Sequence, residues 1–334
     1  MNVRRSFLWS ASAALTIFLV VLFLKVSKLD FRVTIQQLRS VSWVSFATLV
    51  LLTTFHVYLS SLKWRCVDAR LRRPADSAPT KTMSFALTSM GVALGQILPV
   101  QLSMSAARTL GTYFHGRALR RGTGGTLFEQ TFDVMIVGFL AIASAVTLFF
   151  KGGGVVWTVC AIAMAACALL AVGPVVRLIR WQVNALHART VAPQNRILRS
   201  LAGLHDSGLL DAGLGRQLMA LSLARFMIQV LMAGQAAVAI GIHIPLWHLA
   251  AAMPFVIIAC VIVVTPAGLG VNELSYATTL HLFGTPLQVG AQWALANRFL
   301  VASSCFVVAA CAAGGLGLAK MLAAGAPADV LQEE

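Results

Sequence analysis

The sequence predicts an all-α fold, a polytopic integral membrane helical bundle of about six to eight transmembrane helices. Of its 334 residues, 58% are hydrophobic and only 11% are charged, and the mean hydropathy is +0.82. In a soluble domain roughly 25% of the residues are charged. The hydrophobic residues also gather in runs, and many of these runs are long enough to cross a bilayer as a helix. We therefore expect the protein to act in or at the membrane.

These apolar runs follow one another along most of the chain. The first begins after Arg4 and Arg5, and since no small-x-small cleavage site follows it, we expect an uncleaved first helix. We predict one membrane domain over 1–320, with a long basic cytoplasmic loop at 177–216 and a short, disordered, acidic tail at 321–334. A stretch of that loop, 194–204, is a candidate amphipathic surface helix. The runs are 7–24, 41–62, 82–107, 126–150, 152–176, 217–241, 246–264, 274–297 and 299–319.

Two regions contain helix-breaking residues at bilayer depth. Gly95 and Pro99 interrupt the run 82–107, and the segment TPAGLGVNE at 265–273 contains a proline and two glycines. Broken backbone at that depth persists only where protein or a water-filled cavity satisfies its amides and carbonyls. Both regions are therefore expected to be discontinuous or re-entrant. Paired breaks in the two halves of a chain point to a transport site near the midplane of the bilayer.

The distribution of basic residues selects between two topologies for the run 82–107. If this run enters the bilayer and returns, the basic segments 63–81, 108–121 and 177–216 lie on the side of the N-terminus, with 18 Lys and Arg against five on the other side. If it crosses fully, the first two segments fall on opposite sides. The positive-inside rule favours the version that returns. The side of the C-terminus stays open, because 274–297 can either span or return.

The composition also bounds the partners and cofactors. The net charge of +15 is explained by positive-inside topology and attraction to anionic headgroups. Binding of nucleic acid needs a basic patch with interleaved aromatic residues, and the sequence has no such patch, so we expect no nucleic-acid partner. Six cysteines form no C-x-x-C and the seven histidines are scattered, so we expect no metal and no other cofactor. Without a Walker loop, any pumping uses a gradient or runs downhill. No H-E-x-x-H or G-x-S-x-G is present, so no catalytic residue is assigned.

Ionisable residues inside or beside the apolar runs are the candidate site. A charge at the bilayer centre costs about 2.5–3.5 kcal/mol on insertion scales, so pairing or function must offset it. Glu129 and Asp133 are four residues apart and share a helix face. In a purely structural alternative, Glu129 sits among headgroups, Arg225 snorkels, and Arg298 is the buried partner of Glu273 or Asp133. The candidates are Arg108, Glu129, Asp133, Arg225, Glu273 and Arg298.

The chemistry of these groups fits a phosphorylated lipid. Arginine presents a planar fork suited to phosphate, and the N-termini of half-helices aim free N–H groups at anions. A carboxylate nearby can take a proton, or bind an ammonium group or a sugar hydroxyl. The expected lipids are an anionic phospholipid or a polyprenyl-phosphate glycolipid. The predicted binding residues are Pro99, Arg108, Glu129, Asp133, Arg225, Gly268, Gly270, Asn272, Glu273 and Arg298.

Three segments carry a resemblance to a known family. They are LPVQLSMSAAR at 98–108, RRGTGGTLFEQTFDVMIVGFLA at 120–141, and TPAGLGVNE with the helix that follows it to Arg298. Together they resemble the flippase-like family of bacterial and archaeal membrane proteins, also known as the transmembrane region of lysylphosphatidylglycerol synthase. This chain departs from the family's pattern at Ala267 and Asn272, where the family commonly has Gly and Arg, and at 103–105, where serines and a methionine replace glycines and an acid.

The resemblance implies translocation of a lipid or lipid-linked glycan across the bacterial cytoplasmic (inner) membrane, or a helper role to a glycosyltransferase. Lysine transfer is not expected, because 334 residues leave no room for the family's soluble aminoacyl-transferase domain. Two other functions stay open. One is an integral-membrane transferase with Asp133 or Glu273 as base, and the other is an accessory subunit of a glycolipid, hopanoid or polysaccharide pathway. The sequence leaves the oligomeric state undetermined.

Overall fold

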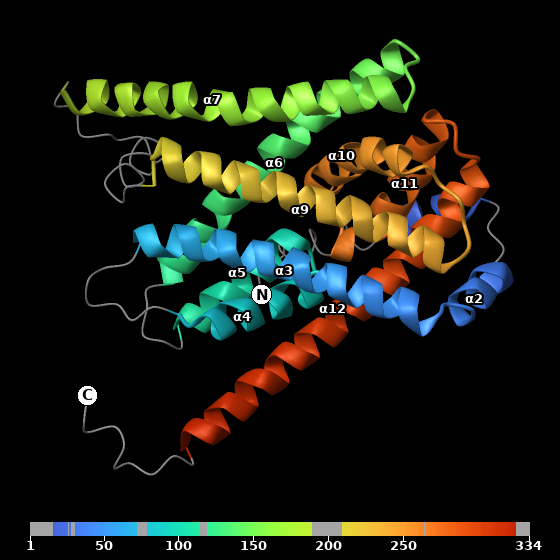
Figure 1. Ribbon diagram of the computed structural model, residues 1–334, viewed down its shortest axis with the longest axis horizontal. Coiled ribbons are helices and arrows are strands. Elements are labelled where there is room, and N and C mark those ends of the chain that lie inside the picture. Colours follow the sequence, from blue (N-terminus) through green and yellow to red (C-terminus); the bar gives the residue numbers. More distant parts are fainter. Residues whose placement is uncertain are drawn as a thin grey trace, which may run out of the picture.

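The computed structural model describes residues 16–25, 27, 31–71, 79–113, 119–188, 209–263 and 265–324. These residues form helices and connections, with no strand among them, so the predicted all-α bundle is confirmed (Figure 1). A short helix, Thr16–Lys25, comes first. The other elements are α2 (Phe31–Arg39), α3 (Trp43–Leu71), α4 (Lys81–Leu94), α5 (Val100–Tyr113), α6 (Leu119–Phe149), α7 (Gly154–Ala188), α9 (Ala212–Ala239), α10 (Leu246–Ile262), η1 (Pro266–Gly268), α11 (Val271–Leu282) and α12 (Leu287–Ala324).

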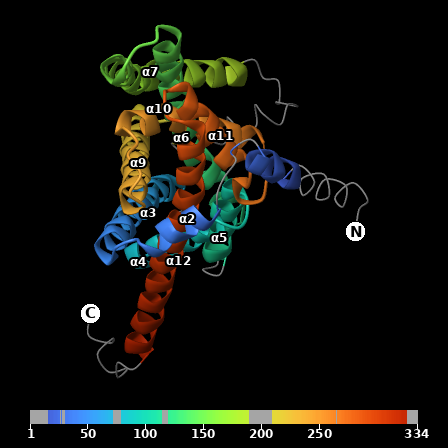
Figure 2. The ribbon, with the colours of Figure 1, turned by 90° about the vertical axis from the view of Figure 1, so that its right-hand side faces the viewer.

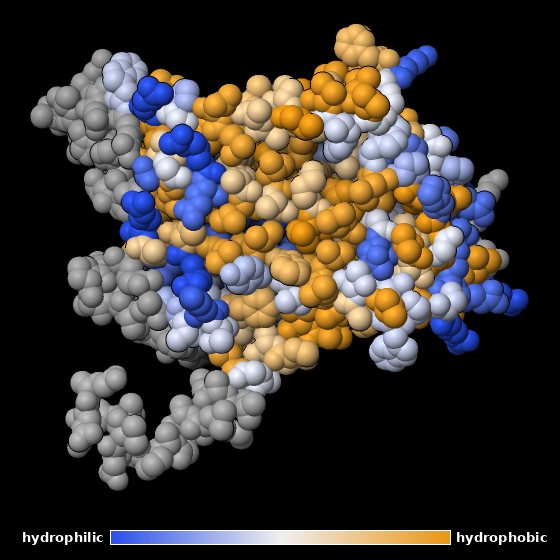
Figure 3. Space-filling view, in the orientation of Figure 1, coloured by the Kyte–Doolittle hydropathy of each residue, from blue (hydrophilic) through white to orange (hydrophobic). Residues whose placement is uncertain are grey.

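Five of the described helices are long and apolar enough to cross a membrane, namely α3, α6, α7, α9 and α12. Helices α3, α7 and α9 run roughly along the long axis of the molecule, and α6 and α12 cross it obliquely (Figures 1 and 2). The surface shows the same organisation, because a broad apolar band separates two ends at which hydrophilic residues gather (Figure 3). The chain is therefore a multi-pass membrane protein.

The run 82–107 forms a helical hairpin that returns to the side from which it came. Thr80 caps α4 by accepting a hydrogen bond from the Met83 amide, and the chain turns at 95–99 before α5 begins. A Cβ built on Gly91 would lie 3.1 Å from the Met104 Cα, so the two helices approach each other closely at this glycine. Both outer ends of the hairpin lie at the end of the bundle where α3 finishes (Figure 1). The returning topology favoured by the basic residues is the one found.

A second hairpin, α10 and α11, enters from the opposite end of the bundle. Helix α10 ends at Ile262, η1 forms the tip, and α11 leads back. The return is fixed by a hydrogen bond of 2.8 Å between His248 Nδ1, near the start of α10, and Thr285 Oγ1, just after α11. Helix α12 then crosses the bundle and ends on the side of the α4–α5 hairpin (Figure 1). This places the C-terminal end of α12 on the side of the basic segments.

The described helices extend beyond some predicted boundaries. Helix α7 continues to Ala188 and α9 begins at Ala212, so helical structure enters both ends of the segment 177–216. The predicted surface helix at 194–204 lies outside the described residues. Asp211 caps α9 by accepting from the Leu214 amide at 3.0 Å. Helix α12 continues past residue 320, to Ala324.

The first helix packs against the beginning of α11 at Gly270. This glycine has a φ of +77°, and a Cβ built on it would lie 2.7 Å from the Leu19 Cβ and 2.9 Å from the Val20 amide nitrogen. Phe23, one turn further on, is buried in a cluster with Ala277 and Ala291 of α11 and α12. Close backbone approach and a left-handed conformation thus both require glycine at this position.

Gly270→Ala should lower the free energy of unfolding by about 1–3 kcal/mol, because the methyl group meets the backbone of the first helix and the residue is held at positive φ. Thermal unfolding in detergent measures the change. Gly138→Ala is the matched control, since a Cβ built on Gly138 in α6 has no neighbour within 4 Å. Equal melting temperatures for the two variants would contradict the described packing.

Candidate functional site

The tips of the two hairpins meet around one cavity inside the bundle. Its volume is about 390 Å³. Gly95 and Pro99 line it from the α4–α5 tip, and Thr265, Ala267 and Gly268 line it from the α10–α11 tip. The remaining walls come from α3, α6, α9 and α12, and from the helices of the two hairpins, including α10 and α11. The two breaks that the sequence places far apart therefore serve a single internal space.

Arg108 and Glu129 form a fully buried ion pair beside this cavity. Arg108 Nη1 lies 2.6 Å from Glu129 Oε2, and neither side chain is more than 2% exposed. Arg108 Nη2 donates to the Ser60 carbonyl at 3.0 Å, and the guanidinium lies 5.2 Å from the centroid of the Trp64 ring. Glu129 is thus enclosed by protein and does not lie among headgroups. The pair ties the returning helix α5 to α3 and α6.

Asp133, one turn further along α6, is shared between two cations. Its Oδ1 lies 2.6 Å from Lys63 Nζ, and its Oδ2 lies 2.5 Å from Arg225 Nη1. Arg225 also donates from Nε to His56 Nε2 at 3.2 Å. Lys63 is completely buried, whereas Arg225 and Asp133 are 16% and 23% exposed and both line the cavity. We call His56, Lys63, Asp133 and Arg225 the Asp133 pole.

The second group of charges holds the tip of the α10–α11 hairpin. Arg298 Nη1 lies 2.6 Å from Glu273 Oε1, and its Nη2 donates to the Ala267 carbonyl at 2.7 Å. Glu273 Oε2 accepts from the Gly270 amide at 2.7 Å. We call Ala267, Gly270, Glu273 and Arg298 the Glu273 pole. Because Glu273 accepts from the amide at the start of α11, that N–H group is not available to an anionic ligand.

Ala267 adopts a left-handed conformation, with a φ of +53° and a ψ of +16°. Such a conformation costs a non-glycine residue roughly 1 kcal/mol or more. The hydrogen bond from Arg298 to the Ala267 carbonyl opposes this strain and fixes the tip.

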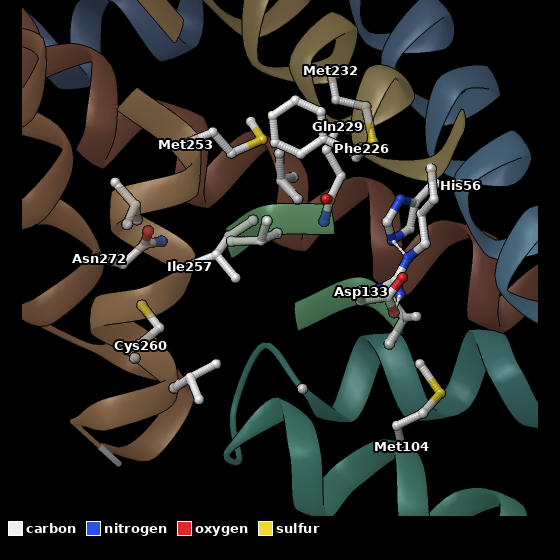
Figure 4. A pocket seen from close by; sticks show the side chains of 18 of the residues that line it. His56, Met104, Asp133, Phe226, Gln229, Met232, Met253, Ile257, Cys260 and Asn272 are labelled. Atoms are coloured by element: carbon white, nitrogen blue, oxygen red, sulfur yellow. Dashed lines mark hydrogen bonds and ion pairs between the residues drawn. The ribbon is translucent and has the colours of Figure 1, made fainter. Parts of the chain in front are cut away.

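The two poles lie at different parts of one amphiphilic cavity. In Figure 4, Asn272 and Cys260 face His56 and Asp133 across the space, and Met253, Phe226 and Ile257 lie between or above them. Methionine and aromatic side chains give the wall an adaptable apolar surface. The cavity can therefore receive a ligand with a polar head and an apolar continuation.

Most of the predicted binding residues come together at this cavity. Three of the ten lie behind its wall: Arg108 holds Glu129, Glu273 holds Arg298, and the Gly270 amide donates to Glu273. The acid–guanidinium pairs foreseen as possible are formed, and Arg298 has Glu273 as its partner. The seven that line the cavity are Pro99, Glu129, Asp133, Arg225, Gly268, Asn272 and Arg298.

The sequence analysis missed Lys63 and His56 as members of the site. Lys63 belongs to the basic segment 63–81, but it is buried and paired with Asp133. Arg108, in the basic segment 108–121, is likewise buried and paired with Glu129. A signal was present, because His56, Ser60 and Lys63 are spaced by four and three residues and so share one helix face. A polar stripe on an otherwise apolar run is such a signal.

Comparison with known proteins gives one family. The family described as lysylphosphatidylglycerol synthase TM region matches residues 10–311, which include all the charged residues of both poles. No curated protein and no solved structure gave a significant match.

Proposed function

Because the chain belongs to the family of the lysylphosphatidylglycerol synthase TM region, we propose that it is a transporter that moves an anionic or glycosylated lipid across the bacterial inner membrane. One observation carries this proposal: two broken hairpins, entering from opposite ends of the bundle, meet at one charged cavity. Half-helices that end at the midplane around such a space are a recurrent construction in transporters.

The cavity suits a headgroup, and the bilayer suits the acyl chains. Arg225 and Arg298 both line the cavity, and guanidinium groups are well matched to a phosphate. We propose that displacement of either hairpin tip changes access to the cavity from the side on which that hairpin enters the bundle. Passage then needs the two tips to move in turn, while the headgroup stays on the same side chains.

The arrangement gives less support to a transferase. A general base needs a carboxylate that is free to take a proton. Asp133 is bonded to Lys63 and Arg225, and Glu273 is bonded to Arg298 and to the Gly270 amide. Both of the carboxylates considered as bases are thus engaged, and we favour transport. An accessory role beside a lipid-modifying enzyme or glycosyltransferase is compatible with transport of that enzyme's lipid.

Leaflet exchange tests the proposal directly. Purified protein is reconstituted into liposomes that carry fluorescent lipids with anionic, zwitterionic or polyprenyl-phosphate headgroups, and a membrane-impermeant quencher reports which leaflet each lipid occupies. We expect at least one anionic lipid to exchange at least tenfold faster than in protein-free liposomes. No acceleration for any lipid of the panel would refute transport, and a new lipid species in mass spectra after adding candidate donors would instead favour the transferase.

A further inference from the structure

We infer that the cavity takes a phosphodiester headgroup that carries hydroxyl groups and no ammonium group. This inference rests on the proposed function and specifies the lipid that the site selects. It follows from three features of the cavity: its surplus of one positive charge, the pairing of each carboxylate with a cation, and buried hydrogen-bonding atoms of lining residues that have no partner among the described residues.

The surplus charge lies at the Asp133 pole. The ion pairs around the cavity contain four cations and three carboxylates, because Asp133 is shared by Lys63 and Arg225. Arg225 uses Nε and Nη1 for His56 and Asp133, and in the part of the chain that the structure describes its Nη2 makes no hydrogen bond. One singly charged phosphodiester neutralises this surplus.

His56 supplies a second donor at the same pole. Its Nε2 accepts from Arg225, so the ring is neutral and its proton is on Nδ1. His56 is 5% exposed and lines the cavity, and Nδ1 has no partner among the described residues. A buried donor without a partner is unfavourable unless a ligand or a water accepts from it.

For an ammonium group, the cavity offers only carboxylates that are already paired with a cation. Both oxygens of Asp133 and both oxygens of Glu273 are bonded. Glu129 is paired with Arg108 and is almost completely buried. With the phosphate bound, an ammonium group would restore the surplus positive charge that the phosphate had neutralised. Ethanolamine, choline and aminoacylated headgroups are therefore disfavoured, which separates this chain from the lysylated lipid in its family's description.

Hydroxyl groups match the wall near the tip of the α10–α11 hairpin. Thr265 Oγ1 and the Asn297 amide oxygen are buried without a partner among the described residues, and both residues line the cavity. Thr265 is 2% exposed and Asn297 is 9% exposed. A hydroxyl group donates and accepts, so a single polyol can satisfy both atoms. Asn272, which faces the Asp133 pole across the cavity in Figure 4, adds a third amide or hydroxyl partner.

The volume limits the size of this polyol. A cavity of about 390 Å³ is near the lower end of the range of roughly 300–1,000 Å³ for small-molecule sites. It suits one glycerol or one monosaccharide attached to the phosphate, and it is small for an oligosaccharide. The headgroup that fits all three features is a glycerol or single-sugar phosphodiester.

Binding of defined lipids to the purified full chain tests this inference without a transport step. The probes are phosphatidylglycerol, phosphatidylethanol, phosphatidylethanolamine and soluble glycerol 1-phosphate, compared by native mass spectrometry or thermal stabilisation in detergent. Phosphatidylethanol has the charge of phosphatidylglycerol but no free hydroxyl. We expect phosphatidylglycerol to bind about fivefold more tightly than phosphatidylethanol, phosphatidylethanolamine to bind most weakly of the three lipids, and glycerol phosphate to compete only at far higher concentration.

Two variants locate the hydroxyl partners. Thr265→Val and Asn297→Leu should each reduce the preference for phosphatidylglycerol over phosphatidylethanol from about fivefold toward unity and leave phosphatidylethanol binding unchanged. Thr278→Val, on the exposed face of α11, is the matched control, because Thr278 hydrogen-bonds within its own helix. If Thr265→Val or Asn297→Leu does not fold, the lipid panel on the unchanged protein still decides.

Three outcomes overturn the inference. If phosphatidylethanolamine binds as tightly as phosphatidylglycerol, the argument from charge is wrong. If phosphatidylethanol binds as tightly as phosphatidylglycerol, the hydroxyl groups have no partners in the site. If glycerol phosphate competes fully, the site binds a soluble anion. Transport can fail while the binding order holds, in which case only the proposed function falls. Exchange of zwitterionic lipids alone would preserve transport and reject the headgroup assignment.

Discussion

Glu129→Gln should lower the free energy of unfolding by about 3–5 kcal/mol, because it leaves the Arg108 guanidinium charged and buried without a counter-charge. Arg108 is completely buried, and its closest acidic contact is Glu129 Oε2 at 2.6 Å. The Ser60 carbonyl and the Trp64 ring remain as neighbours, but neither carries a charge. Thermal or denaturant unfolding in detergent, with the secondary structure as readout, measures the change.

The double variant Arg108→Met with Glu129→Leu is the control for this prediction. It removes both charges, and apolar side chains of similar size replace a buried ion pair at little or no loss of stability. We expect it to recover most of the stability lost in Glu129→Gln. A double variant as unstable as the single one would show that the loss comes from packing and not from the unpaired charge.

Arg225→Gln should abolish most lipid exchange and leave the protein folded. Asp133 keeps its bond of 2.6 Å to Lys63, so no carboxylate is left buried without a cation. The variant removes the side chain that carries the free Nη2 donor and with it the surplus positive charge. Loss of a charge-assisted contact to phosphate corresponds to roughly 1.5–3 kcal/mol, so we expect anionic-lipid exchange to fall about 10–100-fold.

Arg216→Gln is the matched control on the same helix. Arg216 lies near the start of α9, is exposed, and donates to the Ala212 carbonyl of its own helix. It should leave exchange unchanged within twofold. Both variants are compared in the leaflet-exchange assay at equal reconstituted amounts, with melting temperatures as a check on folding. Equal activity of Arg225→Gln and Arg216→Gln would remove Arg225 from the site.

Much of the topology of the bundle could be predicted from the helix-breaking residues and the distribution of basic residues in the sequence. The breakers Gly95 and Pro99, together with the position of the basic segments, predicted a hairpin that returns, and this is what forms. The same reasoning left 274–297 undecided, because few charged residues flank it and the positive-inside rule has nothing to act on. In the structure this run is divided, because α11 ends at Leu282 and α12 begins at Leu287. The bond between His248 and Thr285 at this turn joins residues 37 apart, so it depends on tertiary packing that the sequence does not show.

Most of the ionisable residues that line the cavity were predicted from the sequence, but their pairing was left open between alternatives. The free-energy cost of inserting a charge into the bilayer singles out ionisable residues inside apolar runs. This reasoning identified Asp133, Arg225 and Glu273. It cannot identify the partner, because that depends on how helices distant in sequence rotate and cross. Lys63 shows the limit, since it stands at the end of its run, where a snorkelling lysine and a buried one have the same sequence signature.

The spacing of the ion pairs along the chain has a consequence for biosynthesis. Lys63 and Asp133 are 70 residues apart, and Asp133 and Arg225 are 92 residues apart. At about 5–20 residues per second, α3 emerges from the ribosome roughly 4–14 s before the carboxylate that neutralises it. Lys63 stands near the end of its apolar run, so its ammonium group can reach the headgroups during this interval and is buried only when Asp133 pairs with it. The ion pairs of the Asp133 pole are therefore completed late in synthesis, when α9 supplies Arg225.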